Sequence, residues 1–395
     1  MTGVQTCALP ILQIDFHFAT TYVVARIAGF NQHNAEIIAY SSQYVDDSTT
    51  SGFLRFDNGM RYYREATAHP LFDLDNLDND ESTKSWLPFH FLPGNELQMD
   101  KAPEDATFIQ RLICRPNSPV AQAMMKRVIE VKDRPHALHR LGIASHVFVD
   151  TFAHQGFVGQ KLELNNAAEI KDHESNHLPA MPLPPIGHGI VSTYPDRPFL
   201  KWSYTDSDGK HIIRDNPIDF TTAADELCKH YQRYLIGDFE ADVPGLQERK
   251  ASIFNTLIEN TATSEETRLN EWIKLISSNH FGFGEEKIHY IGKGLNSWKH
   301  EALGDQYLDW LNKAEANATN HPEKFNLLDR IGATLSHGVH TFEAHTTKMP
   351  DLEQVEYKFN PAFLTSNYKL FHDAAADQRH DLTTKIFPKF GIYAG

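Results

Sequence analysis

The stretch that decides the fold is HRLGIASHVFVDTFAHQGF, residues 139–157, the most strongly apolar helical segment of the chain. Its polar residues include an HxxxDxxxH pattern at His146, Asp150 and His154. Because four residues advance an α-helix by slightly more than one turn, these three side chains fall on nearly one face. The neighbouring positions are mostly apolar, so the spacing predicts a buried central helix over 134–157.

Two imidazoles and a carboxylate on one helical face form a ready set of metal ligands, and the carboxylate is able to bridge two ions. A buried charge also needs a partner, because an unpaired ionised group is costly away from water. The alternative is a solvated polar stripe, which the neighbouring Val147, Phe148 and Phe152 disfavour. The sequence therefore predicts a metal site on this helix, with zinc as the expected ion.

Further ligands have to come from elsewhere in the chain, and four polar residues stand in suitable settings. Asp15 and His17 in QIDFHFATTYVVA begin a predicted helix, and His17 is the stronger candidate. His90 in WLPFHFLPG stands between two phenylalanines, which ligation explains better than the alternative of a hydrogen-bonded core histidine. His188 in PPIGHGIV lies between two glycines that permit close approach of the backbone. We expect all four as candidate metal ligands.

Three more aspartates each allow two interpretations. Asp46 and Asp47 in AYSSQYVDDST end a predicted helix, where adjacent carboxylates either bind a metal or serve as a helix-terminal turn feature. In the first case, either of them could also act in catalysis by orienting or deprotonating a water. Asp196 in YPDRP either joins His188 or caps a turn.

The composition is that of an ordinary globular protein. The 395 residues carry a net charge of −15, which leaves no basic footprint for duplex DNA or an anionic membrane. We therefore expect no stable nucleic-acid partner. No apolar run approaches the ~18 residues of a membrane helix, so we do not expect an integral membrane protein. The sequence also lacks a phosphate-binding glycine loop, a serine nucleophile elbow and a CxxC pair. Its pattern does not indicate which oligomeric state the protein adopts.

The first residues, MTGVQTCALPI, have neither the basic start nor the apolar run of a signal peptide. The string TGVQTCALPI equals one reading frame of a common sequencing adapter. We therefore interpret residues 1–11 as adapter-derived and residues 12–395 as a single metal-binding α-helical domain. The two remaining cysteines, Cys114 and Cys228, are too few for a disulfide framework and fit a reducing compartment such as the cytoplasm. A signal peptide lost upstream would change that location.

The rest of the chain is predicted to be mainly helical, with helical spacing over 15–44, over 119–130 and over most of the chain from Thr221 onward. KWSYTDSDGKHIIRDN predicts a β-hairpin, inserted near 199–216. The stretch 46–116 has no long periodic run and indicates loops with short elements. The expected fold class is mainly α: a multi-helix bundle around a buried metal-binding helix, with long loops and one small β-hairpin.

Two family resemblances follow from these motifs. HRLGIASHVFVDTFAH resembles the central HxxxD helix of the zinc-dependent phospholipase C and single-strand-specific nuclease superfamily, all-helical hydrolases with a three-metal cluster. The chain also resembles, along most of its length, a bacterial and fungal domain-of-unknown-function family. The segments that carry this second resemblance are IDFH, AGF, IIAYSSQYVDD, FHFLPG, LGIASHVFVDTFAHQGF, IGHG, YPDRP and RDN. The second resemblance is the more extensive one, and it implies no activity.

The hydrolase resemblance implies a role for each early candidate. His17 matches the early histidine ligand of that superfamily, Asp46 or Asp47 its first aspartate, and His90 its loop histidine. The superfamily also uses an N-terminal tryptophan as a ligand. This chain has no equivalent, and Asp15 is expected to substitute.

The same resemblance implies that His146 and Asp150 form the helix pair, with Asp150 bridging two metals, and that His154 and His188 bind the remaining ion. The superfamily has HxxxE or HxxxD on its next helix, whereas the residue four beyond His188 is Ser192. One or two zinc ions are therefore expected, with three as the upper limit and other divalent metals as alternatives.

The ligand set predicts a metal-dependent hydrolase, with zinc as the expected metal, that cleaves a phosphoester or similar small-molecule substrate with an activated water. The alternative is a non-catalytic, metal-stabilised scaffold or an interaction protein. The central helix also resembles the fungal heterokaryon-incompatibility family, but the acidic balance argues against a membrane-acting protein.

Overall fold

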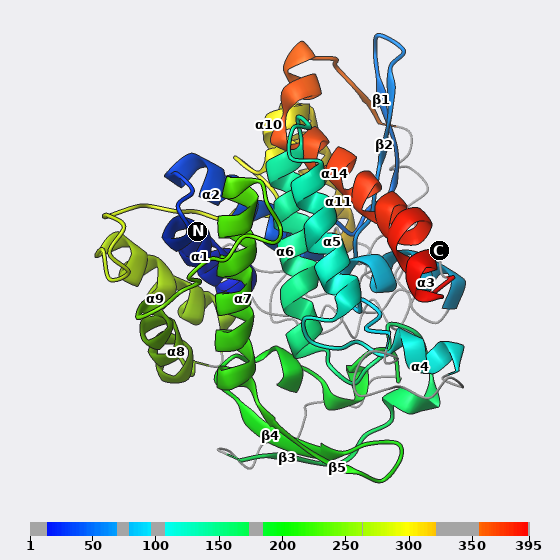
Figure 1. The fold of residues 1–395 in the computed structure, drawn as a ribbon. Helices are drawn as coiled ribbons and strands as arrows, with labels where there is room; N and C mark the ends of the chain where they lie inside the picture. Colours follow the sequence, from blue (N-terminus) through cyan, green and yellow to red (C-terminus); the bar gives the residue numbers. More distant parts are fainter. Residues whose placement is uncertain are drawn as a thin grey trace.

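The computed structural model describes residues 14–68, 79–95, 107–173, 185–262, 264–320 and 355–393. The chain is mainly helical, with two small sheets (Figure 1). The N-terminal half contains η1 (Asp15–Thr20), α1 (Thr21–Ala28), α2 (Gln32–Asp47), β1 (Gly52–Phe56), β2 (Arg61–Arg64), α3 (Asn79–Phe89), α4 (Phe108–Leu112), α5 (Pro119–Glu130), α6 (Ala137–Ala153) and β3 (Ala168–Asp172). After β3 the chain forms η5 (Gly189–Val191), η6 (Tyr194–Asp196), β4 (Lys201–Thr205), β5 (His211–Asp215), α7 (Asn216–Ile236), α8 (Arg249–Glu259), α9 (Glu265–Ser277), α10 (Trp298–Leu303), α11 (Asp305–Asn320), β6 (Glu356–Tyr357) and α14 (Asn367–Asp381).

Helix α6 is the centre of the helical layer. It packs against α2, α5, α7 and α14, and Figure 1 shows it in the middle of the molecule. All of its residues except Leu138 are buried. The predicted central helix is therefore confirmed, with bounds a few residues inside the expected ones.

A glycine sets the distance between α2 and α6. A Cβ atom on Gly142 would lie 2.4 Å from the carbonyl oxygen of Ile38 and 2.5 Å from Cβ of Ser41, closer than real Cβ contacts come. Only glycine allows this approach of the two backbones. It brings the last turn of α2, which carries Asp46, alongside the turn of α6 that carries His146.

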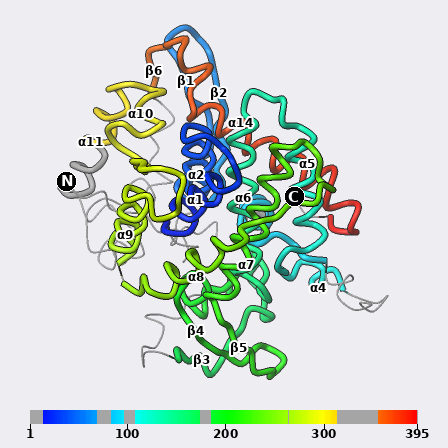
Figure 2. Tube along the Cα trace, turned by 60° about the vertical axis from the view of Figure 1, so that its left-hand side comes forward, coloured from blue at the N-terminus to red at the C-terminus, as the bar shows by residue number. Residues whose placement is uncertain are grey.

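The β-structure departs from the expectation of one small hairpin. The predicted hairpin near 199–216 is present as β4 and β5, but β3 extends it to a sheet of order β3-β4-β5. A second sheet has the order β2-β1-β6, with β1 antiparallel to β2 and parallel to β6. Figures 1 and 2 show the two sheets at opposite ends of the molecule. The expectation of one hairpin was wrong: β1 and β2 form a second hairpin from short strands, and β3 and β6 pair with strands that are distant in the chain.

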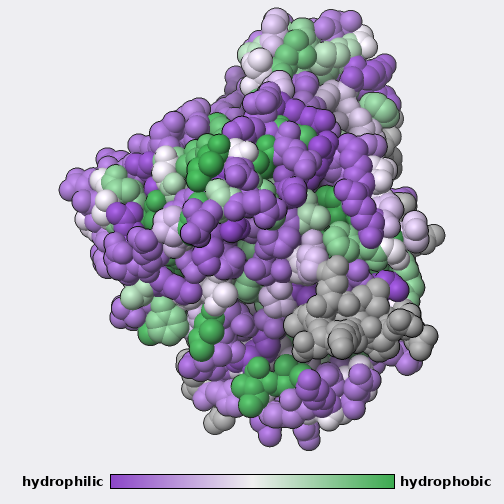
Figure 3. Space-filling model, in the orientation of Figure 1, coloured by the Kyte–Doolittle hydropathy of each residue, from purple (hydrophilic) through white to green (hydrophobic). Residues whose placement is uncertain are grey.

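One face of the molecule is mostly polar. Figure 3 shows a largely hydrophilic face on which hydrophobic residues form small, separate patches. Among the described residues, no helix combines the length and the apolar character needed to cross a bilayer. Residues 1–11, interpreted above as adapter-derived, lie outside the described part of the chain.

Candidate metal centre

Eight side chains from distant segments meet beside the C-terminal half of α6. They form three groups of possible metal ligands, whose nitrogen and oxygen atoms lie within 4.8 Å of one another in each group. The first group is His17, Asp46 and His146; the second is His90, His146 and Asp150; the third is His154, His188 and Asp196. All eight residues are buried. The three groups bring together the predicted ligands His17, Asp46, His90, His146, Asp150, His154 and His188.

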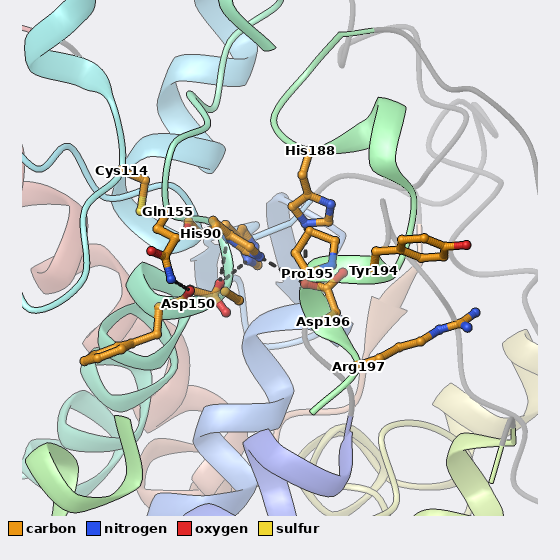
Figure 4. A network of polar contacts seen from close by, with 12 residues as sticks. His90, Cys114, Asp150, Gln155, His188, Tyr194, Pro195, Asp196 and Arg197 are labelled. Carbon is orange, nitrogen blue, oxygen red and sulfur yellow. Dashed lines mark hydrogen bonds and ion pairs between the residues drawn. The ribbon is translucent and has the colours of Figure 1, made fainter. Parts of the chain in front are cut away.

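Asp150 is close to four of the five imidazoles, and Figure 4 shows it beside His90. Its Oδ1 is 3.3 Å from Nε2 of His17, and its Oδ2 is 3.2 Å from Nε2 of His146, 3.3 Å from Nδ1 of His90 and 3.8 Å from Nδ1 of His154. Burial by itself raises the pKa of this carboxyl, but the imidazoles of His154 and His146 hold it well below its usual value. The structure therefore places the Asp150 carboxylate among four imidazoles.

The backbone fixes which nitrogen of His90 and His146 faces Asp150. Nδ1 of His146 donates to the carbonyl oxygen of Ser42 at 2.8 Å, and Nε2 of His90 donates to that of Thr67 at 3.0 Å. In the neutral rings the facing nitrogens then carry lone pairs, and they lie only 3.1 Å apart. Burial lowers the pKa of His90 to about 4, which keeps that ring neutral at neutral pH. Two lone pairs and a carboxylate that face one another could hold a cation between them.

The third group repeats the same arrangement at the end of α6. Nδ1 of His154 donates to the carbonyl oxygen of His90 at 2.9 Å, and Nδ1 of His188 donates to that of Ser192 at 2.9 Å. Their Nε2 atoms face Oδ1 of Asp196 at 3.4 and 3.5 Å. Burial raises the pKa of Asp196 to about 7, and neither of its carboxylate oxygens accepts a hydrogen bond. A cation here would stabilise its ionised form.

The glycine before His188 is required by the fold. Gly187 has a φ of +51°, and a Cβ atom on it would lie 2.2 Å from Cζ of Phe91. The ring of Phe91 in turn stacks on His154, with centroids 4.4 Å apart and an angle of 22° between the planes. One aromatic side chain thus packs the loop of His188 against the end of α6.

The residues fit a divalent metal. For metal–ligand bonds of about 2.0–2.2 Å at a tetrahedral ion, neighbouring ligand atoms lie about 3.4 Å apart. Six pairs of facing atoms within the three groups are 3.1–3.6 Å apart. Metal-binding imidazoles also donate their other N–H to a carbonyl or carboxylate, as four of these histidines do. Nitrogen and oxygen donors in this combination suit zinc and related ions.

His17 is held differently from the other four imidazoles. Neither of its nitrogens has a hydrogen-bond partner, and its ring stacks on His146 at a centroid distance of 3.8 Å. Burial and the neighbouring His146 lower its pKa to about 3. Its backbone belongs to the π-helical turn η1, which a buried ion pair between Asp15 and Arg268 ties to α9 at 3.0 Å. Asp15 therefore lies outside the three ligand groups and anchors the turn that carries His17.

The two aspartates at the end of α2 have different surroundings. Asp46 is the most exposed of the eight residues, at 6%, and its Oδ1 is 3.6 Å from Nε2 of His146. Its Oδ2 accepts a hydrogen bond from Gln43 at 3.2 Å, and burial together with Asp150 raises its pKa well above the usual value. Asp47 accepts a hydrogen bond from the Tyr290 hydroxyl and belongs to none of the three groups.

Two parts of the centre were not predicted from the sequence. Asp196 was left open between ligation and capping, and its place in the third group favours the first. The signal was its position in the same short, proline- and glycine-rich connection as His188. The carbonyl oxygens of Ser42, Thr67 and Ser192 could not be found, because any residue type supplies a carbonyl.

Comparison with known proteins gives a family and no nearer relative. No curated protein and no solved structure matches the chain significantly. One family model, described as a family of unknown function, matches residues 12–386, which agrees with the more extensive of the two resemblances in the sequence. Because the match covers nearly the whole chain, the chain belongs to the family of unknown function DUF6765.

Proposed function

We propose that this chain is a metal-dependent hydrolase that uses zinc, or a similar divalent ion, to cleave a phosphoester. The observation that carries the proposal is that the lone pairs of two histidine nitrogens face each other beside the carboxylate of Asp150. Nε2 of His146 and Nδ1 of His90 face each other at 3.1 Å and lie 3.2 and 3.3 Å from the same carboxylate oxygen. Without a cation this contact is repulsive, and burial makes the repulsion stronger.

The residues of the centre have two roles, metal binding and proton transfer. Asp150, His17, His90, His146 and the third group would hold the metal. When bound, a divalent metal supplies a Lewis acid that polarises the ester and lowers the pKa of water towards neutrality. Asp46 is the group nearest to solvent, and its raised pKa makes it a better proton acceptor at neutral pH. We propose that Asp46 orients the attacking water and takes its proton. Asp47 is the less suitable choice because Tyr290 already donates to its carboxylate.

One observation favours the second candidate, a metal-stabilised scaffold without activity. Apart from Asp46, the ligand residues are at most 2% exposed. Structural metal sites are closed by protein ligands, whereas catalytic sites keep a position for water or substrate. The two candidates therefore differ in one measurable property, the access of a substrate to the metal.

The test is hydrolysis of bis(p-nitrophenyl) phosphate by the full chain, loaded with zinc, before and after the substitution Asp46→Asn. Loss of a general base lowers kcat by about 10²–10⁴-fold, and the variant should keep its metal because seven other ligand residues remain. The matched control is His139→Ala, a buried histidine of the same helix outside the three groups. Full activity in Asp46→Asn contradicts the role of Asp46. No phosphoester activity in a zinc-loaded, folded protein favours the scaffold.

A further inference from the structure

The hairpin β1–β2 exposes an unusual combination of side chains on an acidic protein. The register pairs Phe53 with Tyr63 and Arg55 with Arg61 directly across the two strands. Because side chains alternate along a strand, these four lie on one face of the sheet. Phe53 and Tyr63 are 55% and 46% exposed, and their rings touch at a centroid distance of 5.1 Å. The opposite face, with Leu54 and Phe56, is buried.

The two arginines face each other without a counter-charge. Like charges directly opposite in a sheet are destabilising unless an anion balances them. Within the described part of the chain, neither guanidinium forms an ion pair. The aspartate of the hairpin turn, Asp57, accepts from the backbone N–H of Phe359 on the β6 side. Arginine on an edge strand can serve to discourage aggregation, but Arg55 belongs to β1, the middle strand of the order β2-β1-β6.

The same hairpin has an open edge among the described residues. Strand β2 lies at the end of the order β2-β1-β6. The N–H of Phe56 bonds to the carbonyl of Met60, which makes that pair hydrogen-bonded. In an antiparallel ladder bonded and non-bonded pairs alternate, so Arg61 and Tyr63 direct their backbone N–H and C=O groups away from β1. The residues with outward backbone groups are thus the ones whose side chains are exposed.

We propose that β2 binds an extended acidic segment of a partner protein, which adds to the sheet as a fourth strand. Its backbone would pair with Arg61 and Tyr63, as in other cases of strand addition. An acidic side chain would face Arg61 and Arg55, and an apolar one, two residues away, would face Tyr63. The partner motif is therefore an acidic and an apolar residue with one residue between them.

The observations favour a short acidic peptide over other anionic partners. The rings of Phe53 and Tyr63 meet at 72°, so they do not form the parallel platform on which successive bases stack. A net charge of −15 also repels a long polyanion or an anionic bilayer, whereas a peptide with a few carboxylates meets little of this field. Neither of those partners would use the open backbone edge. The proposal goes beyond the metal centre and does not depend on it.

The test uses fluorescein-labelled peptides and the full chain. The probe repeats Glu-Thr-Val-Thr, which places Glu and Val alternately on one face of an extended strand. One control peptide has Lys in place of Glu, and another has Pro in place of each Thr and Val, which removes N–H groups needed for pairing in either strand orientation. The charge-matched protein variants are Arg61→Glu and Lys210→Glu; Lys210 is exposed in the turn of the other hairpin.

The expected result is saturable binding of the Glu peptide, weakened about tenfold or more by Arg61→Glu and unchanged by Lys210→Glu. Neither control peptide should bind. Three results would overturn the proposal: no binding of the Glu peptide up to about 1 mM, equal effects of the two variants, or equal binding of the Pro peptide. Arg61-dependent binding of phosphatidylserine vesicles or of a thymidine oligonucleotide, without peptide binding, would also overturn the proposed partner.

Discussion

The protein contains two sets of buried histidines, which are equally shielded from solvent but have different neighbours. The site histidines are His17, His90, His146, His154 and His188, and the packing histidines are His139, His230 and His372. Members of both sets are at most 3% exposed, and burial lowers the pKa values of His17 and His230 alike to about 3. Burial and pKa therefore do not distinguish a ligand from a core residue.

The difference lies in the carboxylates. Each site histidine has a ring nitrogen within 3.5 Å of Asp150 or Asp196. A packing histidine has neutral partners instead: Nε2 of His139 meets the side-chain oxygen of Asn367, and the ring of His230 lies between Phe148 and Phe239. Convergence on a buried carboxylate is thus the feature that predicts metal binding.

Metal removal should distinguish the two sets of histidines by the largest change in the free energy of unfolding. If the metal is present at about a thousand times its Kd, a chelator should lower the free energy of unfolding by about 4 kcal/mol. Urea unfolding with and without the chelator measures this effect. The loss should persist in His139→Ala and vanish in Asp150→Ala. Equal stability with and without chelator in the wild-type protein would place the site histidines with the packing ones.

The tether of His17 should give the next largest effect. Arg268→Gln leaves the buried carboxylate of Asp15 without its ion pair, which is expected to cost about 3 kcal/mol of stability. The turn that carries His17 should loosen, so affinity for zinc, measured by competition with a chelating dye, should fall as well.

A second ion pair provides the control for this variant. Arg127 pairs with Asp381 at 3.0 Å, and Asp381 keeps Arg140 and Lys385 as partners after Arg127→Gln. This control should lose about 1 kcal/mol or less and keep its zinc affinity. Unchanged zinc affinity in Arg268→Gln would show that the Asp15 pair only stabilises the fold.

Gly142 lies on α6 between the packing histidine His139 and the site histidine His146. Gly142→Ala adds a Cβ 2.4 Å from the carbonyl of Ile38, and overpacking of this kind costs about 2 kcal/mol. By pushing α2 and α6 apart it should also weaken the bond from His146 to Ser42 and lower zinc affinity. The measurements are urea unfolding and dye competition. A fully stable variant with normal affinity would mean that the helices can separate at no cost.

The smallest effect, counted per pH unit, is the pH dependence that the packing histidine His230 gives to stability. Burial holds the pKa of His230 at about 3, below the value of about 6.5 for an unfolded chain. Between these values the unfolded state binds the additional proton, so the free energy of unfolding falls as the pH drops below about 6.5. One such group contributes at most about 1.4 kcal/mol per pH unit.

The substitution His230→Phe removes this contribution and keeps an aromatic ring beside Phe148 and Phe239. Unfolding in urea at several pH values between about 4 and 7.5 should therefore show a shallower slope for the variant than for the wild type. An identical slope would mean that His230 does not titrate differently in the folded and unfolded protein.

The sequence was most informative where the chemistry is local. Helical spacing alone places His146, Asp150 and His154 on one face, and the structure brings both imidazoles near Asp150. His90 could be found because an imidazole between two phenylalanines has few ways to be satisfied in a core.

Contacts between distant segments could not be predicted in the same way. Asp15 was expected beside the metal because it precedes His17 by two residues, but its partner Arg268 comes from a helix much later in the chain. Asp47 likewise meets Tyr290. The pairing of β1 with β6 joins residues near position 55 with residues near 356, and such long-range pairings leave no local pattern in either segment.

The central claim is that Asp150 and its imidazoles hold a metal, and elemental analysis of the purified full chain tests it most directly. The account predicts near-stoichiometric zinc, or another divalent metal, in the wild-type protein and in His139→Ala, and its loss from a folded Asp150→Ala. Wild-type protein that binds no metal even after incubation with zinc, or Asp150→Ala with unchanged metal content, would contradict it.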